Sequence, residues 1–114
     1  MTDKIVVFST CPNLQEASSL ARALVERRLA ACVNIVPAAR SVYWWQGNVV
    51  DEEEILIVIK SRRDLLKDLQ EELHRVHSYQ VPEVIALTII DGSPAYMRWF
   101  ERELQPPDQD SPKN

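Results

Sequence analysis

The sequence predicts an α+β domain in which two helices pack on one face of a four-stranded antiparallel sheet, with a short further helix at the C-terminal end. Three observations lead to this prediction. The 114 residues are enough for one domain with a core of its own. Four short apolar runs are typical of strands, and three other segments repeat their apolar residues every three or four positions, as helices do.

The first half of the chain predicts a strand, a helix and a second, longer strand. Residues 5–9 are a β-branched and aromatic run that stops before Cys11 and Pro12. Residues 13–28 have the helical period, with Asn13 as a candidate N-cap. Residues 29–45 predict one long strand with a break at Pro37, because proline cannot donate a hydrogen bond to a neighbouring strand. Residues 46–48 supply the turn of a hairpin.

The second half predicts a return strand, a helix, a strand and a last helix. The return strand passes the acidic residues 51–54, enters the apolar run 55–59 and ends at Lys60 and Ser61. The second helix covers about residues 62–76, and the fourth strand covers residues 84–90. Ser93 and Pro94 are typical of a helix start. The resulting order, β-α-β-β-α-β plus a helix, is the ferredoxin-like arrangement. Residues 1–104 are predicted to form the single domain, and residues 105–114 a disordered polar tail.

The predicted strands are apolar on both faces, although two helices can cover only one face of the sheet. The second strand would be longer than about 50 Å at roughly 3.3 Å per residue. Part of it should therefore project from the domain, and its aromatic residues 43–45 suit an interface. We expect a second subunit to cover the remaining sheet face.

Composition and spacing argue against several classes of protein. Gly47 and Gly92 lie far apart, which excludes a glycine-rich phosphate loop. The net charge of −4 argues against nucleic-acid binding. Two cysteines without a C-x-x-C pair exclude a disulfide framework and a zinc knuckle. No stretch approaches the roughly 20 apolar residues of a membrane span, and no nucleophile–histidine arrangement can be assembled. We expect a cytoplasmic protein that is not an enzyme.

Five segments together resemble the CutA family of divalent-cation tolerance proteins: LAACVNI at 29–35, SVYWWQG at 41–47, IKS at 59–61, HSYQVPE at 77–83 and YMRW at 96–99. The resemblance extends over about residues 4–104. It implies a ferredoxin-like subunit, a homotrimer built by strand pairing between subunits, and a role linked to copper and other divalent metals. The trimeric PII signal proteins share this fold and assembly.

His77 is the first candidate metal ligand, because an imidazole beside a turn can offer a nitrogen lone pair, and Glu83 could reach the same cleft. The alternative is that His77 only ends the second helix. Copper-binding members of the family imply a cysteine at the position of Ser9 and two histidines where Val76 and His77 stand. Cys11 would lie on the same side of the strand as Ser9 and is a candidate replacement; a small turn residue is the alternative.

A ligand cleft at a subunit junction is the second predicted site, and its candidate residues are Tyr43, Trp45, Lys60, Tyr79 and Trp99. Packing is the alternative for the aromatic residues. The favoured hypothesis is a homotrimer that binds a divalent metal, copper or zinc. The alternative hypothesis is a PII-like regulatory trimer that binds a small anionic ligand or a partner protein through Lys60 and Arg62. A purely structural trimer is the third.

Overall fold

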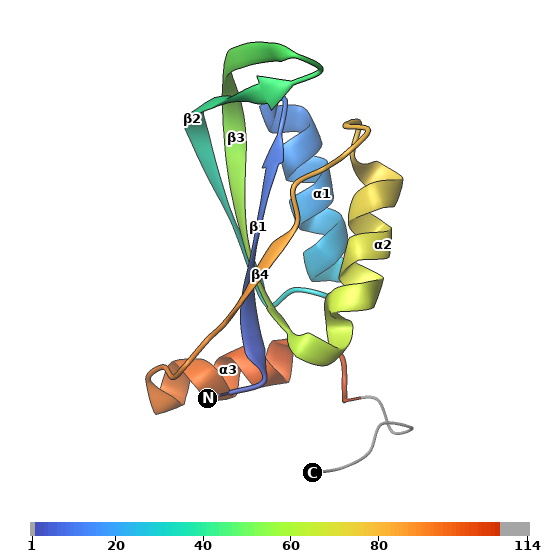
Figure 1. Ribbon diagram of the computed structural model, residues 1–114. Coiled ribbons are helices and arrows are strands. Elements are labelled where there is room, and N and C mark those ends of the chain that lie inside the picture. Colours follow the sequence, from blue (N-terminus) through green and yellow to red (C-terminus); the bar gives the residue numbers. More distant parts are fainter. Residues whose placement is uncertain (1, 108–114) are drawn as a thin grey trace.

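The computed structural model describes residues 2–107 and confirms the predicted order of elements (Figure 1). The strands are β1 (Lys4–Cys11), β2 (Cys32–Trp45), β3 (Asn48–Arg62) and β4 (Ile85–Thr88), and the α-helices are α1 (Leu14–Glu26), α2 (Leu66–Val76) and α3 (Pro94–Glu103). The sheet order is β2-β3-β1-β4, and every neighbouring pair is antiparallel. This is the predicted ferredoxin-like sheet.

Helices α1 and α2 cover one face of the sheet (Figure 1). Successive side chains of a strand point to opposite faces, so Val7 and its register partner Ile59 both point toward the helices. Both are fully buried, and they pack in one core with Leu24 of α1 and Leu73 of α2. Each such side chain contributes about 1.5–3 kcal/mol by leaving water. The hydrophobic core therefore lies between the sheet and this helix pair.

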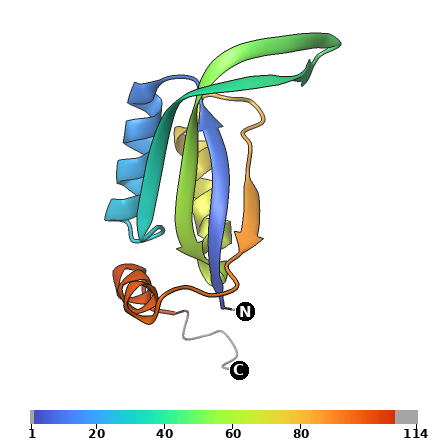
Figure 2. The ribbon, with the colours of Figure 1, turned by 90° about the vertical axis from the view of Figure 1, so that its left-hand side faces the viewer.

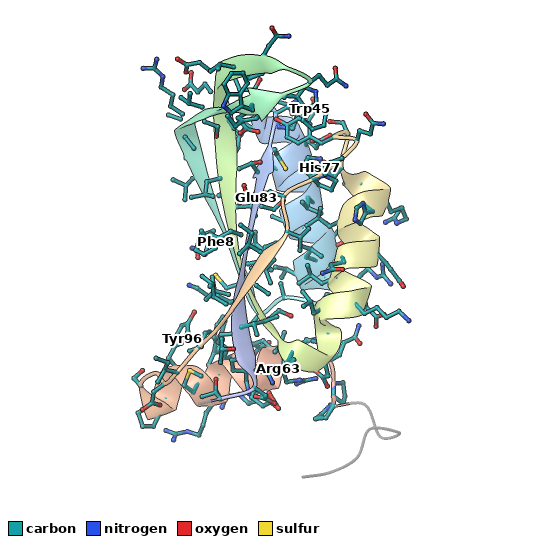
Figure 3. The ribbon with its side chains drawn as sticks, viewed as in Figure 1. Phe8, Trp45, Arg63, His77, Glu83 and Tyr96 are labelled. Carbon is teal, nitrogen blue, oxygen red and sulfur yellow. The ribbon has the colours of Figure 1, made fainter. Side chains whose placement is uncertain are left out.

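The opposite face of the sheet is apolar as well, and we refer to it as the open sheet face. It carries Val6, Phe8, Leu56, Val58, Ile85 and Leu87. Phe8 points away from the helices (Figure 3), and within residues 2–107 no helix covers these side chains. Ile85 and Leu87 of β4 are each 51% exposed. The strands thus carry apolar residues on both faces, as the sequence predicts.

Strands β2 and β3 continue beyond the sheet as a hairpin arm, residues 39–54. Strand β1 ends at Cys11 opposite Ile55, so the arm residues of β3 pair only with β2. The register shifts between Val36 and Ala39, around the predicted break at Pro37, and the arm bends away from the sheet beyond this bulge (Figure 2). The arm is rich in exposed apolar side chains, and its Trp44 is 73% exposed.

The turn at the tip of the arm consists of two residues, Gln46 and Gly47. Their φ angles are 49° and 83°, and Trp45 pairs with Asn48 on either side. Two consecutive positive φ angles are the mark of the type I′ hairpin turn, which matches the twist of the flanking strands. The predicted hairpin turn is confirmed.

Several boundaries of the sequence prediction were wrong. Strand β1 continues to Cys11, two residues beyond its predicted end. Strand β2 begins at Cys32 rather than at residue 29 and bends at the bulge, so it fits within the 47 Å longest dimension of the molecule and falls short of its predicted length. Helix α2 begins at Leu66, because β3 continues to Arg62 and a 3₁₀ turn follows. Strand β4 covers only Ile85–Thr88. Of the predicted tail, residues 108–114 lie outside the described residues, while the Gln105 amide donates to the Arg28 carbonyl.

A buried guanidinium ties the end of β3 to α3. Arg62 is 1% exposed, and its Nε lies 2.6 Å from Asp64 Oδ1 while its Nη1 lies 3.1 Å from Glu101 Oε2. Its Nη2 donates to the carbonyl of Gln105 at 2.8 Å. The planar fork of the guanidinium can make these contacts at once, which a lysine ammonium at the same position cannot do.

Arg62→Lys should lower the free energy of unfolding by about 1–3 kcal/mol, because the charge remains but most of these charge-assisted hydrogen bonds are lost. Urea unfolding followed by circular dichroism measures the change. Arg63→Lys is the matched control, since Arg63 is exposed and should change stability by less than about 0.5 kcal/mol. Equal losses for the two variants would contradict the structural role given to Arg62.

Candidate metal centre

Three possible metal ligands meet where β1, α1 and α2 come together. Cys11 ends β1, Glu16 lies in the first turn of α1, and His77 is the C-terminal cap of α2. Their ligand atoms all lie within 4.8 Å of one another. The Asn13 side chain accepts a hydrogen bond from the Glu16 amide at 2.8 Å, which caps α1 and fixes Glu16 directly after the turn that leaves β1.

The spacing of these atoms is slightly wider than a metal ion requires. Cys11 Sγ lies 3.9 Å from His77 Nε2, and His77 Nδ1 lies 3.8 Å from Glu16 Oε2. Zinc bonds of about 2.3 Å to sulfur and 2.0 Å to nitrogen in a tetrahedral site place the two ligand atoms about 3.5 Å apart. Sγ and Nε2 are therefore a few tenths of an ångström too far apart. Glu16 approaches the other ring nitrogen, so a single ion would bind one of the two nitrogens and draw in the remaining ligand, with all three ligand atoms within 4.8 Å of one another.

Glu16 carries a buried carboxylate oxygen without a hydrogen-bond donor. Its Oε1 accepts from the Ser78 amide at 3.0 Å, whereas its Oε2 has no hydrogen-bond partner among the described residues. A buried oxygen left without a partner costs about 1–3 kcal/mol. Because this oxygen lies beside the imidazole and the thiol is close by, the three groups fit a divalent cation by charge and by donor type.

The electrostatic potential at Cys11 is negative, because two carboxylates lie near it. Burial first, and then the charges of Glu16 and Glu54, raise the pKa of the Cys11 thiol to about 12. The thiol is therefore protonated at neutral pH in the absence of a cation, because both causes disfavour a thiolate. The same carboxylate charges would stabilise a dication that took the place of the thiol proton.

His77 is fully engaged in hydrogen bonds. Its Nε2 donates to the carbonyl oxygen of Thr10 at 2.5 Å, and its Nδ1 accepts from the Tyr79 amide at 3.0 Å. The amide can only donate, so Nδ1 carries no proton, and the imidazole is the neutral Nε2–H tautomer. The side chain lies between α1 and α2, beside the loop that leaves α2 (Figure 3).

Tyr79 connects this histidine to the root of the hairpin arm. Its ring centroid lies 4.7 Å from that of His77, and its hydroxyl donates to Glu54 Oε2 at 2.6 Å. Burial and then the bond to Glu54 raise the pKa of Tyr79 above its ordinary value, so the hydroxyl keeps its proton. Glu54 is 4% exposed and pairs with Ala39 immediately beyond the bulge in β2.

The structure brings together two of the three metal ligands predicted from the sequence. Cys11 and His77 belong to the group, while Glu83 is exposed and lies outside it. The sequence prediction missed Glu16. Its signal was local, since a glutamate in the first turn after an Asn13 N-cap must lie near the cysteine that precedes the turn, Cys11.

The five predicted cleft residues do not gather in one place within residues 2–107. Tyr43 and Trp45 belong to the arm, and Tyr79 lies at its root. Lys60 lies toward the other end of β3, where its Nζ is 5.7 Å from the centre of the Tyr96 ring. Trp99 lines a shallow groove of about 400 Å³ with Val25, Glu26, Arg28, Ala30, Ala31 and Glu103. Figure 3 shows Trp45 and Tyr96 at opposite ends of the molecule.

The family model described as CutA1 divalent ion tolerance protein matches residues 5–103 of the chain. The chain belongs to this family. It is 46% identical over 95 residues to the divalent-cation tolerance protein CutA of Thermus thermophilus, with 83% of the chain and 92% of that protein covered. It is 48% identical over 101 residues to a chloroplastic CutA protein of Arabidopsis thaliana, with 89% of the chain and 56% of that protein covered.

Solved CutA1 structures have the same fold. The structure from Thermus thermophilus superposes with a TM-score of 0.87 at 42% identity, covering 90% of this chain and 99% of that one. The structure from Oryza sativa superposes with a TM-score of 0.88 at 44% identity, covering 91% and 95%. The chain spans about half the length of the plant and animal CutA proteins that it matches. No helix among residues 2–107 of this CutA1 chain is long and apolar enough to cross a membrane.

The buried, protonated thiol of Cys11 should be almost inert toward iodoacetamide in the folded protein. We expect alkylation of Cys11 at pH 7.5 to be at least about a hundredfold slower than in guanidinium chloride, where the thiol regains an ordinary pKa. Mass spectrometry of the Cys32→Ser variant, which leaves Cys11 as the sole thiol, measures both rates. Native and unfolded rates within tenfold of each other would contradict the described environment.

Proposed function

We propose that this CutA1 protein binds a divalent cation, copper or zinc, through Cys11, Glu16 and His77, and that this binding underlies a role in metal tolerance. The observation that carries the proposal is the buried Glu16 Oε2, which has no hydrogen-bond donor among residues 2–107 and lies 3.8 Å from His77 Nδ1. A cation would satisfy this oxygen, and the family description supports the metal-related role.

The donor set favours copper and zinc over calcium or magnesium. Sulfur and imidazole nitrogen are the preferred ligands of the former, whereas the latter are bound by oxygen ligands. Three protein ligands also leave a fourth position for a further group, as in zinc sites that are not purely structural. The chain's own contribution is to position these ligands: the Asn13 cap holds Glu16, and the end of α2 holds His77.

We favour metal binding over the PII-like alternative because of Arg62. That alternative needs Lys60 and Arg62 together to recognise an anion, but Arg62 is buried and its guanidinium is bound to Asp64, Glu101 and the Gln105 carbonyl. Of this pair, Lys60 alone is left to meet a ligand. We further propose that the protein is not an enzyme and that it acts in the cytoplasm.

Calorimetric titration with Zn²⁺ and Cu²⁺ should show one binding event per chain in the wild type. His77→Gln should weaken binding at least about tenfold, because the imidazole ligand is lost and second-sphere changes alone already cost 10–100-fold. His74→Gln is the matched control, since His74 is an exposed histidine on the same helix and should leave the affinity unchanged. Equal affinities for all three proteins would exclude His77 as a ligand.

We also propose that three subunits assemble through the open sheet face and the hairpin arm. The open sheet face is an apolar surface without a covering element among residues 2–107, and the arm projects from the subunit with exposed aromatic side chains. Large exposed apolar surfaces of this kind mark subunit interfaces. Closed cyclic assembly would let each arm reach a neighbouring copy.

Light scattering should give a mass about three times the 13.1 kDa of one chain. Leu87→Lys places an ammonium on the open sheet face and should lower that mass at micromolar concentration, because burying an unpaired charge is strongly unfavourable. Leu14→Lys is the matched control, since Leu14 is similarly exposed, at 55%, but lies on α1 away from this face. A wild-type mass near 13 kDa would reject the assembly.

A further inference from the structure

We propose that Tyr79 connects the metal centre to the root of the hairpin arm through two hydrogen bonds, from its amide to His77 and from its hydroxyl to Glu54, which we call the Tyr79 latch. A cation bound at His77 breaks the first of these bonds and so loosens the root of the arm. This inference rests on the proposed metal binding at Cys11, Glu16 and His77. It adds a regulatory consequence: occupancy of the metal centre would change a surface that lies on other elements of the fold. Tyr79 acts here as a positioning residue and is not itself a ligand.

The first step is that the free lone pair of the neutral His77 imidazole is already used by a hydrogen bond. A neutral imidazole has one nitrogen with a free lone pair, and in this structure the lone pair on Nδ1 accepts the Tyr79 amide at 3.0 Å. A cation bound at Nδ1, about 2.0 Å away in the same direction, would occupy the space of that amide. A cation bound at Nε2 would shift the ring proton to Nδ1, where it would face the amide hydrogen. Either way, the Tyr79 amide loses its acceptor.

The second step is the position of the Tyr79 hydroxyl. Its 2.6 Å hydrogen bond to Glu54 is the only side-chain hydrogen bond of the buried Glu54 carboxylate among the described residues. Glu54 pairs with Ala39 at the first register position of the arm after the bulge. A displacement of Tyr79 therefore acts on the pair of residues at which the arm leaves the sheet.

The third step is thermodynamic reciprocity. If a bound cation disfavours the position that Tyr79 has in this structure, then the hydrogen bond from its hydroxyl to Glu54, which favours that position, must lower the affinity for the cation by the same factor. Removal of the hydroxyl should consequently tighten cation binding. A Tyr79 that merely supported the shape of the site would have the opposite effect, because its truncation would loosen the ligands.

Calorimetric titration with Zn²⁺ separates these two roles. Tyr79→Phe keeps the ring and the amide but removes the hydrogen bond to a charged group, so we expect about tenfold tighter binding. Tyr43→Phe is the matched control: it removes the bond from the Tyr43 hydroxyl to Glu52, which is 2.5 Å long and also on the arm, and among the described residues Tyr43 makes no hydrogen bond to His77 or Tyr79. Its affinity should stay within about twofold of wild type. Equal or weaker binding by Tyr79→Phe overturns the latch.

Hydrogen exchange of the backbone amides tests the structural consequence. Zn²⁺ should speed exchange at Ala39 and Glu54 in the wild type at least about threefold, and in Tyr79→Phe these amides should exchange rapidly with or without Zn²⁺. Unchanged exchange in a wild type that binds Zn²⁺ overturns the latch and leaves the metal centre intact. A wild type that binds no Zn²⁺ or Cu²⁺ overturns the proposed function itself.

Discussion

The antiparallel pairing of β3 with both β1 and β2 is the constraint on which the rest of the structure depends. Alternate side chains of β3 point toward the helices or toward the open sheet face, as Ile57 and Val58 do. A slip of one residue would exchange these two sets and expose the core. The same register sets the start of the hairpin arm, because β1 ends at Cys11 opposite Ile55, and β3 continues from there with β2 as its only partner among the described residues.

The candidate metal centre is a consequence of where β1 ends. A turn of two residues follows Cys11, so the first turn of α1, with Glu16, lies beside the strand that precedes it. Helix α2 packs against α1 and ends at the same end of the sandwich, which brings His77 to the carbonyl of Thr10. Three ligands from three elements therefore meet without any extended loop of their own.

Local sequence signals predicted the fold well and the site only in part. Strand and helix periods, the turn at Gly47 and the break at Pro37 depend on neighbouring residues, and each appears in the structure. The end of β3 was missed, because Arg62 is held by partners 39 and 43 positions away in sequence. Glu83 was proposed for its closeness to His77 along the chain, yet it is exposed, whereas Glu16 approaches His77 only through the packing of α1 on α2.

The state of His77 decides what kind of metal centre this can be. A site with its lone pairs free would bind a cation tightly and change little on doing so. Here the imidazole is neutral and its one acceptor nitrogen is taken by Tyr79, while Glu16 Oε2 stays without a donor. Under the proposed metal binding, part of the binding free energy would break an existing hydrogen bond, which would lower the affinity and couple occupancy to the position of Tyr79. If the proposed binding holds, such a centre would be better suited to reporting a rise in cation concentration than to storing the cation.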